Sequence, residues 1–94
     1  MTRGESIKRE IEERIATTRT TEILLQRERI NKAIKLETER VYKLAENIST
    51  DEFPPMFKAQ LEENKIFNEV RVEFENDGFE FQEEADIWYL YLAD

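Results

Sequence analysis

The stretch that divides this chain reads Ser49-Thr50-Asp51-Glu52-Phe53-Pro54-Pro55. Phe53 precedes a proline, and a proline ring disfavours the α conformation in the residue before it. A proline also suits the first turn of a new helix. This stretch therefore predicts that one helical segment ends here and that another begins at residue 54 or 55.

Residues 3–48, on the N-terminal side of this boundary, have the composition of a helical arm. They contain no proline and are rich in residues that favour helices. One apolar stripe consists of Ile7, Ile11 and Ile15, which step by four residues. A second stripe follows a heptad pattern and consists of Ile23, Ile30, Ile34, Val41, Leu44 and Ile48. We interpret the second stripe as an oligomerisation surface and expect a homodimer, because a chain this short supports only a modest core.

The two stripes do not superpose, and the segment between them is Thr17-Thr18-Arg19-Thr20-Thr21. Threonine lowers helix propensity because its side chain is stiff and competes for backbone hydrogen bonds. The arm is therefore either two consecutive helices that meet at residues 17–21, or one long helix whose buried face changes there. The threonines favour the break.

The C-terminal side predicts a short helix followed by antiparallel strands. Phe57 and Leu61 lie four residues apart, which favours a helix from residue 54 to about residue 64. Apolar and charged residues then alternate over residues 69–75, which is typical of a strand. Asn76-Asp77-Gly78 predicts a hairpin turn, and residues 79–82 predict the return strand.

The aromatic segment at residues 86–92 is either a third strand or a short buried helix, and its composition favours the strand. The expected fold class is therefore α+β. It comprises a long N-terminal helical arm (one long or two consecutive helices), a short helix, and a small antiparallel β-hairpin or three-stranded sheet. We expect a single domain over residues 1–94, with the arm at 1–48 and an acidic helix-plus-hairpin part at 54–94.

The charges of this chain are unevenly distributed. The formal net charge is -8, yet residues 1–50 carry a net +2 and residues 51–94 a net -10. Seven carboxylates lie within the predicted hairpin region: Glu69, Glu73, Glu75, Glu80, Glu83, Glu84 and Asp86. Because alternate residues of a strand project to the same side, these carboxylates are expected to share one sheet face. Such a face can attract a basic cleft, so we interpret these residues as a partner-binding site.

The residue types that most enzymes rely on are scarce. The chain has no histidine and no cysteine, and so lacks the commonest general base and the best thiol nucleophile. Its serines, Ser6 and Ser49, lie near expected helix ends, where serine usually serves as a cap. Two glycines are too few for a glycine-rich phosphate loop. We therefore expect no catalytic residues, no cofactor and no metal site.

The first functional hypothesis is a non-enzymatic acidic binding protein that inhibits or regulates a basic, nucleic-acid-handling partner protein. Short acidic proteins of this kind are common among phage-type inhibitors and DNA mimics. The alternative is a structural or assembly protein that oligomerises through its helical arm.

The net charge disfavours direct nucleic-acid binding. No segment has the ~20 apolar residues that span a bilayer. We expect a cytoplasmic location, in the host cytoplasm if a phage encodes the protein.

Overall fold

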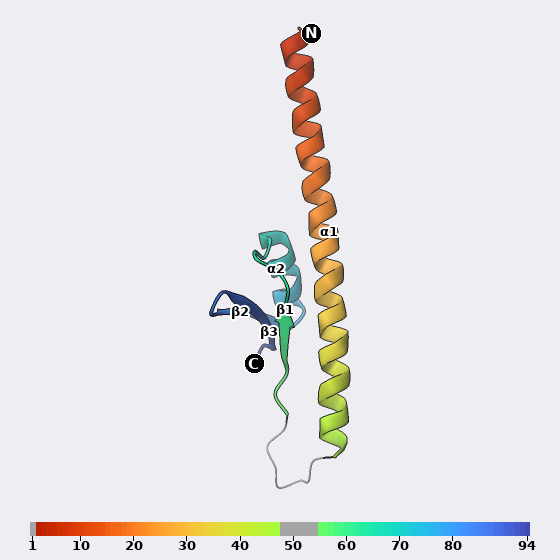
Figure 1. Cartoon of the computed structure of the whole chain (residues 1–94), viewed down its shortest axis with the longest axis vertical. Coiled ribbons are helices and arrows are strands. Elements are labelled where there is room, and N and C mark those ends of the chain that lie inside the picture. The colour runs from red at the N-terminus through yellow and green to blue at the C-terminus, as the bar shows by residue number, and fades with distance from the viewer. Residues whose placement is uncertain (1, 48–54) are drawn as a thin grey trace.

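The computed structural model describes residues 2–47 and 55–94 and has an α+β fold (Figure 1). The elements in chain order are α1 (Arg3–Glu46), β1 (Lys58–Leu61), α2 (Asn68–Asn76), β2 (Phe79–Glu84) and β3 (Ile87–Leu92). The predicted fold class is confirmed: a long N-terminal helix, a short helix and a three-stranded antiparallel sheet. Ile48 and residues 49–54 of the boundary predicted at 49–55 lie outside the described residues.

Helix α1 is continuous, so the alternative of one long helix is confirmed and the favoured break at residues 17–21 was wrong. The hydroxyls of Thr17, Thr20 and Thr21 donate to the carbonyl oxygens four residues earlier, at 2.9 to 3.0 Å. Hydroxyls bonded in this way no longer compete for other backbone groups, and the helix runs through. At its start, the Thr2 side chain caps the helix by accepting from the Glu5 N–H at 3.2 Å.

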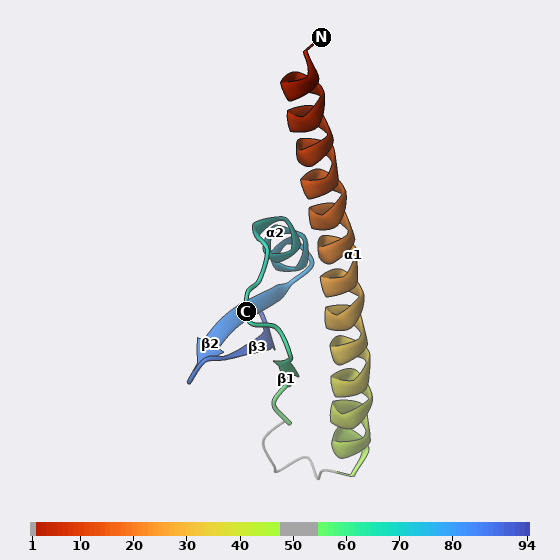
Figure 2. The same cartoon turned by 45° about the horizontal axis from the view of Figure 1, so that its top comes forward.

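The sheet has the strand order β1-β3-β2, and both pairings are antiparallel. Its central strand, β3, confirms the third strand predicted at residues 86–92. In Figures 1 and 2, β1 lies beside the C-terminal half of α1, and the β2–β3 hairpin extends away from that helix. The core between the sheet and the helices consists of Ile30, Phe57, Ala59, Leu61, Val70, Phe74, Phe81 and Leu90.

The predicted helix at residues 54–64 was wrong, because this segment contains β1. Phe57, Ala59 and Leu61 are all buried, whereas Gln60 between them is exposed. The spacing of Phe57 and Leu61 fits a helix and a strand equally well. Pairing with β3, almost thirty residues further along the chain, selects the strand.

The predicted strand at residues 69–75 was also wrong, because these residues lie in α2. Val70 and Phe74 are four residues apart and buried, but Val72 is 47% exposed. In a strand all three would share one face. In a helix, residues four positions apart share a face, whereas the residue midway between them points elsewhere. Val70 and Phe74 therefore enter the core and Val72 does not.

The predicted hairpin turn at Asn76-Asp77-Gly78 is instead the end of α2. The N–H of Gly78 donates to the Glu75 carbonyl at 3.2 Å, and its φ of +93° suits a glycine that follows a helix. The actual hairpin joins β2 to β3 through Ala85 and Asp86, whose φ angles are +51° and +65°. Two positive φ values are the mark of a type I′ turn, which usually carries asparagine or glycine.

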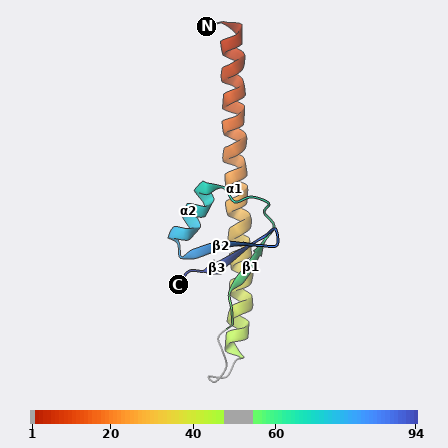
Figure 3. The same ribbon diagram turned by 90° about the vertical axis from the view of Figure 1, so that its left-hand side faces the viewer.

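The molecule is elongated, because part of α1 has no other element beside it. The extents are 73 × 22 × 22 Å, and the radius of gyration is 19.1 Å. A compact chain of this length would have a radius of gyration of about 12 Å. Figure 3 shows the N-terminal part of α1 projecting beyond every other element. Residues 2–18 are all exposed, and the first side chain of α1 to reach another element is that of Arg19.

One buried polar side chain joins α1 to the loop between β1 and α2. Gln26 is only 2% exposed. Its amide nitrogen donates to the Lys65 carbonyl at 2.6 Å and to Glu63 at 3.2 Å, and its amide oxygen accepts from the Phe67 N–H at 3.0 Å. Buried backbone groups are costly when unpaired. Gln26 therefore fixes the loop that positions α2.

We predict that Gln26→Leu lowers the free energy of unfolding by about 2–4 kcal/mol, because it leaves the Lys65 carbonyl and the Phe67 N–H unpaired. Urea unfolding followed by circular dichroism measures the change. The matched control is Gln82→Leu, which makes the same substitution at an exposed position of β2. Equal stability of the two variants would contradict this role for Gln26.

Candidate functional site

The seven carboxylates interpreted as a partner-binding site do not lie on one sheet face. Glu69, Glu73 and Glu75 lie on α2, while Glu80, Glu83 and Glu84 lie on β2 and Asp86 is in the β2–β3 turn. The expectation of a single row was wrong because residues 69–75 lie in a helix and not in a strand. The structure therefore divides these residues into two groups with different surroundings.

The α2 group is largely engaged by basic side chains. Arg19 binds Glu69 at 2.8 Å, and Arg27 binds Glu73 at 2.7 Å, so both pairs connect α2 to α1. The hydrogen bond from Arg19 lowers the pKa of Glu69 below its ordinary value. Glu75 lies 3.6 Å from Arg71 on the same helix. These carboxylates contribute to the attachment of α2 and expose little unbalanced negative charge.

Glu84 belongs to a cluster on the outer face of the sheet that crosses all three strands. The Lys58 ammonium lies 2.9 Å from Glu84 and 4.3 Å from the centre of the Tyr89 ring. The Tyr91 hydroxyl donates to Glu84 at 3.0 Å. Hydrogen bonds from Lys58 and Tyr91 lower the pKa of Glu84, and the bond to Glu84 raises the pKa of Lys58. This face is a mixed aromatic and charged surface.

Three of the seven carboxylates stay free of ion pairs within residues 2–47 and 55–94: Glu80, Glu83 and Asp86. All three are exposed and belong to the β2–β3 hairpin. Glu80 and Glu83 project to opposite sides of β2, because the side chains of a strand alternate. We call this trio the acidic hairpin. It is the part of the predicted site that can still attract a basic partner.

The residues interpreted as an oligomerisation surface mostly face the core of their own chain. Ile30 is fully buried, and Ile23, Ile34 and Val41 pack against the same core. Leu44 is 42% exposed. These contacts account for the heptad pattern within one chain. Self-association through this stripe stays a prediction.

The other apolar stripe of α1 is the surface to which the sequence analysis assigned no role. Ile7, Ile11 and Ile15 are 49%, 52% and 63% exposed. With 100° between successive residues, they lie within about 80° around the helix, and their centre is about 100° from the direction of Ile30. We call them the isoleucine stripe. Their four-residue spacing was visible in the sequence, but nothing there showed that they stay uncovered.

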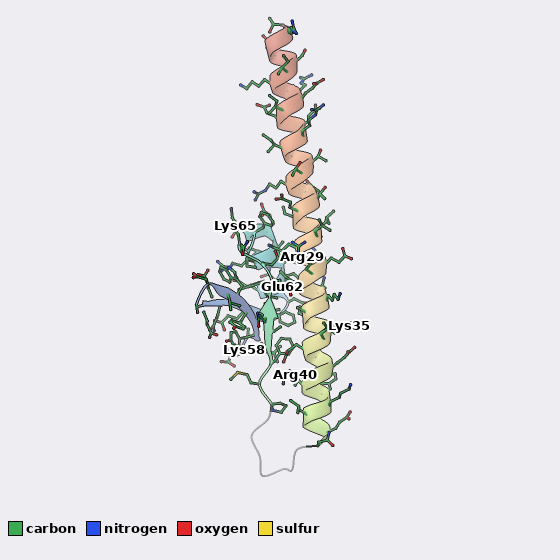
Figure 4. All side chains as sticks on the ribbon, viewed as in Figure 1. Arg29, Lys35, Arg40, Lys58, Glu62 and Lys65 are labelled. Carbon is green, nitrogen blue, oxygen red and sulfur yellow. The ribbon has the colours of Figure 1, made fainter. Side chains whose placement is uncertain are left out.

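A groove of about 570 Å³ lies between α1 and β1. Arg29, Leu36 and Arg40 line it from α1, and Ala59 and Glu62 line it from β1 and the loop that follows. Figure 4 shows Arg29 and Arg40 on the side of α1 that faces β1, and Lys35 on the other side. Arg29 is held there by Glu63 at 2.6 Å, and Arg40 donates to the Met56 carbonyl at 3.1 Å. These arginines are engaged in holding the chain together.

Glu63 is a largely buried carboxylate that also lines this groove. Burial raises its pKa, but hydrogen bonds from Arg29 and Gln26 outweigh that effect, and the pKa lies below its ordinary value. The carboxylate is therefore charged at neutral pH and stabilises the fold. That stability is present above the ordinary pKa of a glutamate and is lost as the pH falls through the lowered value.

No group of three His, Cys, Asp or Glu side chains that could hold a metal ion occurs in the described ranges, 2–47 and 55–94. Among the helices in those ranges, none combines the length and apolar character needed to cross a membrane.

No protein-family model matches this chain, and no curated protein and no solved structure matches it either.

Proposed function

We propose that this protein is a non-enzymatic binding protein whose contact element is the projecting N-terminal part of α1, residues 3–18. The isoleucine stripe would pack against an α-helix of its partner. The observation that carries this proposal is that Ile7, Ile11 and Ile15 are each about half exposed or more, on one side of a helix with no other element beside it.

The limited stability of the projecting part, residues 3–18, gives the proposal its physical basis. Residues 3–18 continue the packed part of α1, but all of their side chains are exposed. Residues 3–18 contain one alanine and two threonines, and most helical stability in proteins comes from packing an apolar face. A partner helix along the isoleucine stripe would supply that packing. This is the recognition mode in which an amphipathic helix presents residues at four-residue spacing.

We predict that a photo-crosslinking amino acid placed at Ile11 forms adducts with a bound protein in cells that express the chain. The matched control places the same amino acid at Arg9, which is also exposed but lies about 160° from Ile11 around the helix. Adducts should form at position 11 and be scarce at position 9. Equal labelling at the two positions, or none at position 11, would contradict the proposal.

A second candidate function is the binding of a basic protein, as an inhibitor or regulator, through the acidic hairpin. It is favoured by the free and exposed carboxylates of Glu80, Glu83 and Asp86 in the half of the chain whose net charge is -10. A local excess of charge of this kind raises the rate of encounter with an oppositely charged surface.

For this second function we predict that lysine substitutions at Glu80, Glu83 and Asp86 together slow association with immobilised poly-lysine at low ionic strength. The matched control substitutes Glu13, Glu28 and Glu39, which are exposed on α1, and changes the net charge equally. The hairpin variant should associate more slowly than the control, and added salt should remove the difference. Equal rates at low salt would show that only net charge matters.

A further inference from the structure

We infer that the helix that packs on the isoleucine stripe is the same segment of a second copy of this chain, in antiparallel orientation. This inference rests on the proposed function and names its partner. The two copies would be related by a twofold axis at Ile11, and their sheets would lie at opposite ends of the assembly.

The spacing of the stripe makes it complementary to itself in this orientation. Ile7 and Ile15 lie four residues on either side of Ile11. When two such helices run in opposite directions with their Ile11 side chains opposed, Ile7 of each copy meets Ile15 of the other. All six isoleucines then lie in one seam, and the overlap of residues 3–19 is about 25 Å long.

The charged residues beside the stripe are arranged in the same way. Lys8 and Glu12 follow one edge of the stripe, and Glu10 and Arg14 follow the other. In an antiparallel pair each edge faces the same edge of the second copy. Lys8 then lies within about 3 Å, along the helix axis, of Glu12 in the other chain, and Arg14 lies equally close to Glu10. The pairing thus places four opposite-charge contacts along the seam, against two like-charge contacts at the same axial distance, Glu12 with Glu12 and Glu10 with Glu10 of the second copy.

These four side chains are available for such contacts. Within the described residues, Lys8, Glu10, Glu12 and Arg14 belong to no ion pair, and all are exposed. By contrast Arg19, Arg27 and Arg29, further along α1, are each bound to a carboxylate of the same chain. The free charges of α1 nearest to the isoleucine stripe are therefore the ones that an antiparallel copy would pair.

Net charge also favours the antiparallel arrangement over the parallel one. A parallel pair would bring two segments of net charge -10, residues 51–94 of each copy, to the same end of the assembly. Like charges repel, and the repulsion falls with distance and with salt. The antiparallel pair separates these segments and lays each N-terminal half against that of the other copy.

The seam is small, which sets the affinity to expect. Three half-exposed isoleucines per chain amount to less apolar surface than a stable interface of standard size buries. The dissociation constant of the pair should therefore be micromolar or weaker, with residues 3–18 gaining helical order as the pair forms.

Sedimentation equilibrium from micromolar to millimolar concentrations should show a monomer–dimer equilibrium, and Ile11→Asp should shift it to monomer.

The decisive test of orientation uses single cysteines, because the natural chain has none. Ile7→Cys and Ile15→Cys both replace exposed side chains, and circular dichroism checks that each variant folds. Under mild oxidation, an equimolar mixture should form the disulfide between positions 7 and 15 in at least about tenfold excess over either symmetric disulfide, because only the antiparallel pair brings these positions within bonding distance. Peptide mass mapping identifies each product.

Each other outcome overturns the inference in a distinguishable way. An excess of the disulfide between two copies of position 7 would mean a parallel pair. A monomer at every concentration, combined with photo-crosslinking of position 11 to a different protein, would mean that the partner is not a second copy and would leave the proposed function intact. A monomer with no adduct at position 11 would overturn both proposals.

Discussion

The amide of Gln26 is the contact on which the arrangement of this fold depends. A single buried side chain on α1 satisfies the Lys65 carbonyl and the Phe67 N–H, and donates to the Glu63 carboxylate. The loop that carries these groups joins β1 to α2, so its position determines where Val70 and Phe74 enter the core. Besides this contact, α1 and the C-terminal half adjoin through apolar packing, through the hydrogen bond from Arg40 to the Met56 carbonyl, and through ion pairs. Apart from the pair of Arg29 with Glu63, these ion pairs are exposed on both sides and individually weak.

The basic residues of α1 add ion pairs to this attachment. They neutralise part of the negative charge of the C-terminal half. Arg19, Arg27 and Arg29 bind carboxylates that follow β1 or belong to α2. The net +2 of residues 1–50 and the net -10 of residues 51–94 are thus partly two sides of one intramolecular contact. Two smaller surfaces are left for the proposed binding of a partner. They are the acidic hairpin and the isoleucine stripe.

The sequence predicted the class of the fold and strands at residues 79–82 and 86–92, but it placed the hairpin turn at the wrong position and exchanged a helix and a strand. Residues 57–61 and 70–74 each contain apolar residues both two and four positions apart, so each fits either structure. Contacts with β3 and α1, distant in sequence, decide between them. Asn76-Asp77-Gly78 is a helix stop as well as a hairpin signal, while the real turn at Ala85-Asp86 lacks the usual asparagine or glycine.

Helix α1 has two parts, one that packs against its own chain and one, residues 3–18, that we propose is stabilised by pairing. Amide hydrogen exchange measured across a range of protein concentrations tests this division most directly. We expect the amides of residues 23–41 to be protected at every concentration, because Ile23, Ile30, Ile34 and Val41 anchor this segment to the core. The amides of residues 3–18 should gain protection only as the concentration rises. Strong protection of residues 3–18 in the dilute monomer, or none at high concentration, would contradict the account.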